Sequence, residues 1–435
     1  MISWKQVDPL MQRQGEEVLR KLLESGFQGY FVGGCVRDEL MGRPVHDMDI
    51  ATSANPEQVI ELFERTVPTG IQHGTVTVLM ADYHFEVTTF RKESSYGDHR
   101  RPLSVEYVDD ITEDLQRRDF TMNAIARDID GTLIDPFHGR EDIELGVIRC
   151  VGIAAERFDE DALRMMRGIR FTANFAFRPV KSMWRALLEG RDKLSFIAME
   201  RIRVELEKIV LGVHPLRGLA LIERSGLLHY VKVPVILPSE LRRDLLEAIV
   251  YVQEEDSEIR WSLLVQGLDI SGAEVSRLMK AWTFSNSVAQ STSEIVLFDE
   301  AWSEIRSKIS LQNEEQLRIN WVQLQVRFGK PVAARWLKRQ TILLRECCML
   351  DTTRSGTELR ALELTCKWHE GVTVHSVQDL AVSGSEVLFI TGKKAGPWLG
   401  ELMKQWLLSV AMGEIPNEKE LLLEQAKAVV NLGGR

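Results

Sequence analysis

The first third of the chain mixes one clear helical pattern with several short strand-like patterns. Val18, Leu19 and Leu22 recur at helical spacing and the pattern stops near Gly26, so a helix is predicted over residues 12–26. The strand-like runs cover residues 30–32, 47–51, 75–80 and 85–90, and the last two are rich in Val and Thr. Helices are also expected at about 35–41 and 56–63, which gives a mixed α/β block.

The rest of the chain is predicted to be helical. The α/β block closes near Asp142, and helical patterns dominate from Asp159 onward, with a loop expected over residues 371–376. At 435 residues the chain exceeds a single compact core, so two to four domains are expected.

Composition places the chain among ordinary globular proteins. Hydrophobic residues make up 44% and charged residues 27%. No apolar run is long enough to span a bilayer, and the N-terminal residues lack the pattern of a signal peptide, so no membrane partner is expected. Five cysteines without Cys-x-x-Cys spacing favour neither zinc nor a disulfide framework, and they predict a reducing cytoplasmic location.

The net charge of −10 argues on its own against a nucleic-acid partner. Basic residues are nevertheless segregated in one segment, which holds six Lys and Arg and no Asp or Glu: Arg327, Lys330, Arg335, Lys338, Arg339 and Arg345. Charge alone favours a solvated helix face for this segment. It becomes a candidate phosphate-binding surface only if other motifs require RNA.

Asp47 and Asp49 are a candidate metal site. On a strand, residues two apart point to the same face, so the two carboxylates would converge. Oxygen ligands of this kind suit Mg²⁺ that keeps some of its water and is shared with substrate phosphates. Glu86, on a later strand-like run, is a candidate third carboxylate. A lone Asp-x-Asp is more often a solvated turn, so the assignment depends on its neighbours.

Gly33 and Gly34 stand between a predicted strand and a predicted helix. Without a Cβ, their backbone N–H groups could approach phosphate oxygens, although a tight turn is the better interpretation of the pair taken alone. Arg37 and Arg118 could bind triphosphate oxygens as bidentate partners. The alternative for Arg118 is a surface ion pair with Asp119 or Glu113.

Asp161 and Arg164 form a candidate base-reading pair. If both lie on one helix, their i, i+3 spacing makes them neighbours, and the carboxylate accepts hydrogen bonds while the guanidinium donates them. Cytosine and adenine each present an amino donor beside a ring acceptor, whereas uracil and guanine present the reverse order. The pair would therefore select C and A, by roughly 1–3 kcal/mol for a good bidentate match. A plain Asp–Arg ion pair on an exposed helix is the competing interpretation.

Arg167 and Arg170 continue the same i+3 series and could extend it toward phosphate or primer. Gly168, inside this predicted helix, lowers helix stability by about 1 kcal/mol relative to Ala. The residue could admit a ligand or another helix, and the sequence does not decide between these.

Several motifs in a fixed order carry a family resemblance. They read Gly-Gly-x-Val-Arg-Asp followed by Asp-x-Asp, Arg-Arg-Asp-Phe-Thr-x-Asn-Ala, Asp-Pro-Phe, and Glu-Asp-Ala-Leu-Arg-Met-Met-Arg, at residues 33–49, 117–124, 135–137 and 160–167. The chain resembles the bacterial class II tRNA nucleotidyltransferases of the polymerase-β superfamily, which include the CCA-adding enzymes. The resemblance covers about residues 28–205 and returns more weakly near the C-terminus.

The resemblance implies a polymerase-β-type α/β head with a mixed sheet, followed by an all-α neck, body and tail in a seahorse-like outline. We place these parts at residues 1–145, 146–212, 213–325 and 326–435. The implied activity is template-independent addition of CCA to tRNA from CTP and ATP by a two-metal mechanism. The oligomeric state, monomer or homodimer, stays open.

The resemblance also assigns roles to individual residues. Asp47 and Asp49 would bind Mg²⁺. Glu86, proposed above from its position on a later strand-like run, would complete the catalytic set. The nucleotide would be bound by Gly34, Arg37, Arg118, Asn123, Asp161, Arg164, Arg167 and Arg170. The tRNA would be bound by Arg327, Lys330, Arg335, Lys338, Arg339, Lys393 and Lys394.

Related activities share these motifs. A-only addition is the closest rival, and CC-only addition and polyadenylation are more distant ones. Residues 91–102 are polar and resemble the flexible loop that CC-only enzymes typically lack, which favours full CCA addition. A catalytically inactive RNA-binding relative would be expected to lose Asp47 and Asp49, and a metal-dependent phosphohydrolase would need more histidine than His46 beside Asp47.

Overall fold

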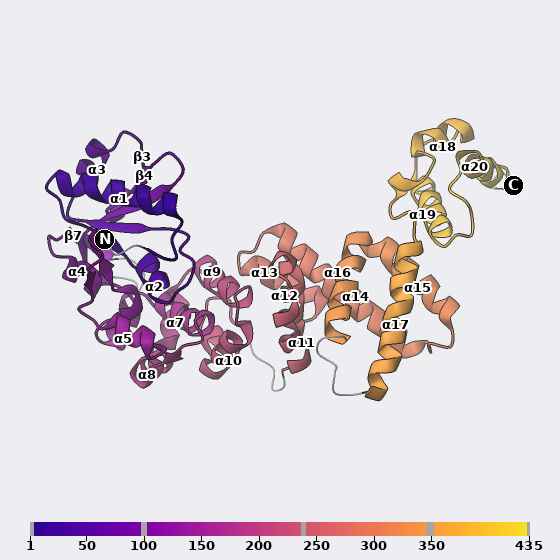
Figure 1. Cartoon of the computed structure of the whole chain (residues 1–435). Helices are drawn as coiled ribbons and strands as arrows, with labels where there is room; N and C mark the ends of the chain where they lie inside the picture. Colours follow the sequence, from indigo (N-terminus) through magenta and orange to yellow (C-terminus); the bar gives the residue numbers. More distant parts are fainter. Residues whose placement is uncertain (1–3, 97–101, 236–240, 345–351, 433–435) are drawn as a thin grey trace. The chain divides into compact units, whose positions relative to one another are not determined.

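The computed structural model describes residues 4–96, 102–235, 241–344 and 352–432. The chain forms two compact units, Met1–Ile236 and Leu237–Arg435. In its described residues no helix is long and apolar enough to cross a membrane. The mixed-sheet head and the helical remainder confirm the predicted fold class (Figure 1). The four-part division and the seahorse-like outline stay predictions.

The first unit begins with a mixed sheet. Its strands are β1 (Gly29–Val32), β2 (Asp49–Thr52), β3 (Thr66–Gly70), β4 (Thr75–Leu79), β5 (His84–Thr89), β8 (Ala126–Arg127) and β9 (Leu133–Ile134). They lie in the order β3-β4-β5-β2-β1-β8-β9. The β2–β5 pair is parallel, with Ile50 beside Val87, and the other pairs of this sheet are antiparallel. This crossover brings Asp49 on β2 next to the strand that carries Glu86.

Two small two-stranded sheets complete the β structure. One joins β6 (Arg91–Tyr96) to β7 (Pro102–Tyr107), and the other joins β10 (Val147–Ile148) to β11 (Arg178–Pro179). Most of the polar segment expected to be a loop is therefore paired, because β6 and β7 run antiparallel from Arg91 opposite Tyr107 onward. Residues 97–101 of that segment lie outside the described residues.

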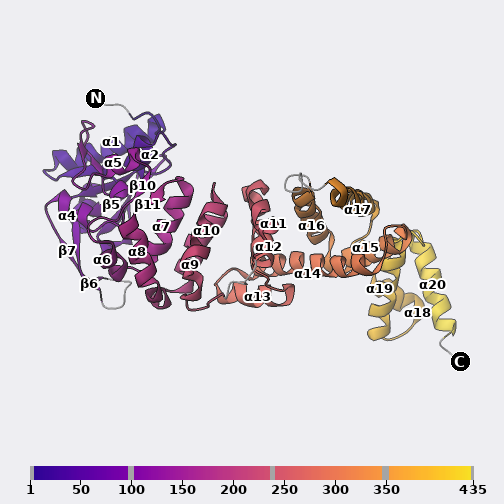
Figure 2. The ribbon, with the colours of Figure 1, turned by 90° about the horizontal axis from the view of Figure 1, so that it is seen from below.

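Helices cover the sheet and continue from it. Those of the first unit are α1 (Pro9–Glu24), α2 (Gly34–Leu40), α3 (Pro56–Leu62), α4 (Ile111–Gln116), α5 (Gly139–Glu144), α6 (Ala154–Glu160), α7 (Leu163–Asn174), α8 (Lys181–Gly190), α9 (Met199–Val210) and α10 (Pro215–Ser225). The predicted helix over 12–26 is α1, and it starts earlier because Asp8 caps it and Pro9 opens it. Its Val18 and Leu22 are buried with Phe31 of β1 in the head core. Figure 2 shows α7, α9 and α10 side by side beyond the head.

The second unit is helical. Its helices are α11 (Arg243–Glu247), α12 (Ser257–Gly267), α13 (Gly272–Ala281), α14 (Asn286–Lys308), α15 (Glu314–Phe328), α16 (Lys330–Ile342), α17 (Thr352–Gly371), α18 (Gly384–Thr391), α19 (Pro397–Ala411) and α20 (Lys419–Leu432). The long α14 packs against α12, α13, α15 and α16 (Figure 2). Phe298, Trp302, Trp321 and Trp336 meet in an aromatic core, where the Phe298 and Trp321 ring centroids are 5.3 Å apart.

Candidate active site

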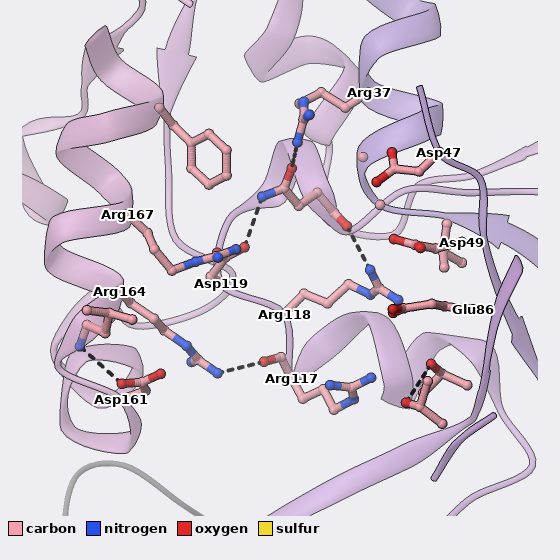
Figure 3. Close-up of a pocket in the computed structure, with 18 of the residues that line it drawn as sticks. Arg37, Asp47, Asp49, Glu86, Arg117, Arg118, Asp119, Asp161, Arg164 and Arg167 are labelled. Carbon is pink, nitrogen blue, oxygen red and sulfur yellow. Dashed lines mark hydrogen bonds and ion pairs between the residues drawn. The ribbon is translucent and has the colours of Figure 1, made fainter. Parts of the chain in front are cut away.

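One pocket of about 620 Å³ in the first unit gathers every site residue predicted before position 171 (Figure 3). These residues are Gly34, Arg37, Asp47, Asp49, Glu86, Arg118, Asn123, Asp161, Arg164, Arg167 and Arg170. Eight arginines and five Asp or Glu residues line the pocket, so its local charge is positive although the chain carries −10. The pocket suits an anionic ligand that also needs a cation.

The acidic part of the pocket consists of Asp47, Asp49 and Glu86. The strand was predicted from residue 47 but begins at Asp49, so Asp47 precedes it and the argument from strand alternation is wrong for this residue. Both aspartates nevertheless line the same pocket. Burial, reinforced by the charges of Asp47 and Glu86, raises the pKa of Asp49 to about 6, against the opposing effect of Arg118 and Arg37.

This donor set suits a divalent cation. Carboxylates that crowd together around a buried one are stabilised by a hard cation with oxygen ligands. Among the described residues, no group of three or more His, Cys, Asp and Glu side chains is placed to hold a metal ion. The two aspartates would therefore share the metal with water and substrate oxygens, as Mg²⁺ commonly does. The role of Glu86 as a third carboxylate stays a prediction.

Gly33 shapes the pocket wall beside Arg118. Its φ is +74°, and a Cβ built on it would lie 2.8 Å from Nη1 of Arg118. Its N–H donates to the carbonyl of Ile125 at 3.3 Å, so Gly34 is the glycine of the pair that stays a candidate for the predicted phosphate contact. Gly33 instead makes room for the Arg118 guanidinium.

Arg118 is held by a buried partner that the sequence did not indicate. Its Nη2 lies 3.2 Å from Oδ2 of Asp114, whose side chain is fully buried. The alternative prediction of a surface pair with Asp119 or Glu113 is wrong, because Arg118 follows the C-terminal end of α4 and lies four positions after Asp114, which brings Asp114 within reach.

A chain of hydrogen bonds links the head to α7. Arg37 Nη1 donates to Oδ1 of Asn123 at 2.6 Å, and Nδ2 of Asn123 donates to Oδ1 of Asp119 at 3.0 Å. The other oxygen of Asp119 accepts from Nε of Arg167 at 2.7 Å. Burial alone would raise the pKa of Asp119, but the charge of Arg167 and the Asn123 hydrogen bond lower it to about 2. Asn123 thus lines the pocket with both ends of its amide engaged.

The expected helix over Asp161 and Arg164 is broken. Asp161 has φ −141° and ψ 103° and stands between α6 and α7, so the two residues are not i, i+3 neighbours on one helix. A local hydrogen bond accounts for the break between the helices. The Asp161 carboxylate accepts a hydrogen bond of 3.1 Å from the Leu163 N–H at the start of α7. Both side chains still line the pocket, from either side of the break.

These two side chains also have separate ionic partners. Asp161 accepts from Nη2 of Arg201 at 2.7 Å, and Arg164 donates from Nη1 to Glu160 at 2.6 Å. Nη2 of Arg164 donates to the carbonyl of Arg117 at 3.0 Å (Figure 3). The competing prediction of an exposed Asp161–Arg164 pair is therefore wrong: Arg164 is buried, and Asp161 pairs with α9.

Arg167 and Arg170 both lie on α7, as predicted. Nε of Arg170 is 2.6 Å from Oε2 of Glu205, and its guanidinium lies 4.0 Å from the Phe171 ring centroid. Gly168 was predicted to admit either a ligand or another helix, and the structure shows a packed helix. A Cβ there would lie 2.3 Å from Cε of Met183 on α8, so the glycine admits a neighbouring helix.

Sequence reasoning missed several lining residues. Asp119 and Arg117 lie inside the motif at residues 117–124, and Arg201 lies within the stretch 28–205 that the resemblance covers, so a signal for all three existed. No sequence pattern indicated that Thr75 and Thr88 line the pocket. They meet only through the β4–β5 register, which places their hydroxyl oxygens 3.0 Å apart.

The basic residues predicted to bind tRNA lie in the second unit. Arg339 is 1% exposed, and its Nη1 pairs with Asp299 at 2.9 Å, so its assignment as a phosphate contact is wrong. It faces inward from α16 beside the aromatic core. Lys338 is exposed but pairs with Asp256. Arg335 is half-buried, and the remaining predicted cations are exposed, namely Arg327, Lys330, Lys393 and Lys394.

Comparison with known proteins covers most of the chain. Residues 29–149 match the family model of the poly(A) polymerase head domain. Residues 176–237 match one described as a "probable RNA and SrmB-binding site of polymerase A". Residues 339–426 match domain 2 of a tRNA nucleotidyltransferase.

Individual relatives align from end to end. The CCA-adding enzyme of Enterococcus faecalis is 37% identical, over 95% of each chain. That of Lactiplantibacillus plantarum is 35% identical, over 97% of this chain and 98% of its own. The crystal structure of the Bacillus stearothermophilus CCA-adding enzyme in complex with CTP is 33% identical, with a TM-score of 0.75 over 98% and 99% of the two chains. The chain therefore belongs to the family of CCA-adding enzymes, as its motifs and its pocket indicate.

Proposed function

We propose that this protein adds CCA to the 3′ ends of tRNA from CTP and ATP, without a nucleic-acid template, and releases pyrophosphate. The observation that carries this proposal is the single pocket in which a carboxylate pair, an arginine-rich wall and the Asp161 and Arg164 side chains meet. Relatives solved with CTP or ATP, and one complexed with tRNA, support the choice of substrates. We place the reaction in the cytoplasm.

Family membership implies a divalent metal, and Mg²⁺ is the ion we propose. Asp47 and Asp49 would hold it. When bound, the metal supplies activation of the 3′-hydroxyl and neutralisation of charge on the leaving pyrophosphate. Because Asp49 has its pKa raised to about 6 by burial and by its acidic neighbours, cation binding competes with protonation at this carboxylate.

The arginine-rich wall would bind the triphosphate. Arg118 reaches the pocket through the space that Gly33 leaves, and Asp114 fixes its guanidinium. Arg37 is oriented by Asp38 at 2.8 Å and by Asn123, and it lies 4.9 Å from the Phe175 ring centroid. Such guanidinium groups bind phosphate oxygens bidentately, and their fixed orientation lowers the entropy lost on binding.

Asp161 and Arg164 would read the base. A carboxylate and a guanidinium each have more hydrogen-bonding capacity than one ionic partner uses. The ion pairs with Arg201 and Glu160 hold the two groups in place before the nucleotide arrives. An acceptor beside a donor then matches the Watson–Crick edge of C or A and opposes that of U or G.

A tRNA assay with three substrates tests this proposal. Transcripts that end before CCA, after C and after CC are each incubated with protein, Mg²⁺ and one labelled nucleotide. We expect CTP to extend the first two and ATP to extend the third. Addition of A to the third transcript alone would replace CCA addition by A-only addition, and no addition at all would favour an inactive RNA-binding relative.

A further inference from the structure

Phe171 places an aromatic ring in the wall of the arginine-rich pocket. It lies on α7, lines the active-site pocket and is 4% exposed. Three guanidinium groups lie around its ring. Cζ of Arg170 is 4.0 Å from the ring centroid, and Cζ of Arg37 and Cζ of Arg167 are each 5.5 Å from it. All three arginines also line the pocket, so the ring is a contact that these cations share.

The three arginines come from two separate parts of the chain. Arg37 belongs to α2, whereas Arg167 and Arg170 belong to α7. Figure 3 shows Arg37 and Arg167 pointing into the pocket from different helices. Phe175, at the C-terminal end of α7, extends the aromatic surface, because its ring stacks on that of Phe171 with 5.6 Å between centroids and 13° between planes. Arg37 lies 4.9 Å from the Phe175 centroid, so the two rings hold an arginine of α2 against α7.

An aromatic ring is suited to this place by its electrostatics. Neighbouring guanidinium groups repel one another, and they gather only where a negative potential offsets the repulsion. The face of an aromatic ring supplies such a potential and carries no net charge. A guanidinium that is attracted by its flat face keeps N–H groups at its edge for phosphate oxygens.

Carboxylates hold the same arginines in a different way. Each arginine has one such partner: Asp38 for Arg37, Asp119 for Arg167 and Glu205 for Arg170. A carboxylate occupies one edge of the guanidinium and cancels one positive charge, whereas the ring does neither. A further carboxylate in place of the ring would remove positive charge that a triphosphate requires.

We propose that Phe171 is a positioning residue for the binding of the nucleotide triphosphate. Its ring gathers Arg37, Arg167 and Arg170 into one cluster without reducing their positive charge. The inference rests on the proposed function, which makes the triphosphate the ligand of these arginines. Because base reading is assigned to Asp161, with Arg164, the contribution of the ring is the same for every nucleotide.

Fluorinated phenylalanines at position 171 test the role of the ring face. Fluorine atoms weaken the negative potential of the face and change the shape of the ring little. Isothermal titration calorimetry of the full-length protein, with Mg²⁺ present, measures the Kd of inorganic tripolyphosphate, which carries no base. We expect this Kd to rise stepwise with one, two and three fluorine atoms, by about tenfold in total, at an unchanged thermal midpoint. The same residues at position 85 are the control, because Phe85 is buried in the head core and does not line the pocket.

Leucine substitutions separate triphosphate binding from base selection. Phe171→Leu keeps an apolar side chain and loses the ring, so the KM values for CTP and ATP should rise by the same factor, about tenfold. The preference of kcat/KM for CTP over UTP should stay at the wild-type value, as should the Kd for tRNA. Phe85→Leu should leave all of these quantities unchanged.

Two results would overturn the proposal. One is equal tripolyphosphate affinity across the fluorinated series at position 171. The other is a loss of affinity that follows a fall in the thermal midpoint, which would assign the ring to packing alone.

The CCA-addition assay separates this failure from failure of the proposed function. Wild-type protein that adds CCA, while fluorination leaves tripolyphosphate binding unchanged, refutes the role of Phe171 alone. Tripolyphosphate binding that weakens with fluorination, in a protein whose wild type adds no nucleotide, refutes the proposed function alone.

Discussion

The Asp161 carboxylate lies 2.7 Å from Nη2 of Arg201, a residue forty positions later in the chain. This ion pair joins the break between α6 and α7 to helix α9, and it sets the direction of the carboxylate that we propose to read the base. We therefore expect Arg201 to influence base selection together with Asp161.

Loss of Arg201 should relax base selection. In Arg201→Ala, Asp161 loses its ionic partner, and we expect the preference of kcat/KM for CTP over UTP to fall about tenfold, within the range of one bidentate contact. Asp161→Ala should relax the same preference, and Arg201→Lys should restore part of it. An unchanged CTP-to-UTP ratio in both alanine variants would contradict the base-reading assignment.

Loss of Asp47 should abolish chemistry and leave tRNA binding intact. Asp47→Ala removes one of the two proposed metal ligands, so single-turnover addition of CMP should fall by at least about a thousandfold, while the Kd for tRNA changes little. Asp130→Asn, at an exposed turn, is the control. Robust turnover by Asp47→Ala would mean that the metal site is elsewhere.

Gly33→Ala should raise the KM for nucleotide. A Cβ at this position would lie 2.8 Å from Nη1 of Arg118, so the guanidinium must move away from the triphosphate. Gly42 is a matched control, because its φ is +66° and a Cβ there would meet nothing within 4 Å. Both variants should lose about 1 kcal/mol of stability through their backbone conformation. Only Gly33→Ala should raise the KM for nucleotide. Equal KM values in the two variants would show that the position of the Arg118 guanidinium does not depend on the missing Cβ of Gly33.

Stability should depend on pH through Asp119. Its pKa is lowered to about 2 in the folded protein, against about 3.9 in an unfolded chain. Its charged form therefore stabilises the fold above about pH 4, and this contribution is lost as the pH falls toward 2. Urea unfolding measures the free energy of unfolding of the wild type and of Asp119→Asn. We expect the wild type to be the more stable of the two near neutral pH, and this difference to become smaller below about pH 4. A difference that stays constant from pH 7 to pH 3 would refute this role.

Substitution of Arg339 should lower protein stability, whereas substitution of Arg327 should weaken tRNA binding. Arg339→Ala leaves the buried Asp299 without its ionic partner and should destabilise the second unit by about 3 kcal/mol. Arg327→Ala, at an exposed position, should leave the thermal midpoint unchanged and weaken tRNA binding about threefold. The opposite pattern would restore Arg339 as a phosphate contact.

The sequence predicted the head, the helical remainder and the residues that meet in the pocket, because motifs in a fixed order constrain which side chains share a site. It did not predict the break at Asp161, since i, i+3 spacing is compatible both with one helix and with two helices that meet. It also misplaced Arg339, because a basic segment does not reveal which cation on an amphipathic helix faces inward. The Arg201 contact required tertiary packing between α7 and α9.

The eight arginines of the pocket have a consequence for how substrates arrive. At low ionic strength a polyanion approaching from afar meets the field of a chain with net charge −10 and is repelled. At physiological ionic strength the Debye length shrinks to about 8 Å, so the distant repulsion fades while the arginines still act at contact range. The rate at which RNA associates should therefore pass through a maximum as the salt concentration rises. Collisions of RNA with the rest of the surface, away from these arginines, would be short-lived.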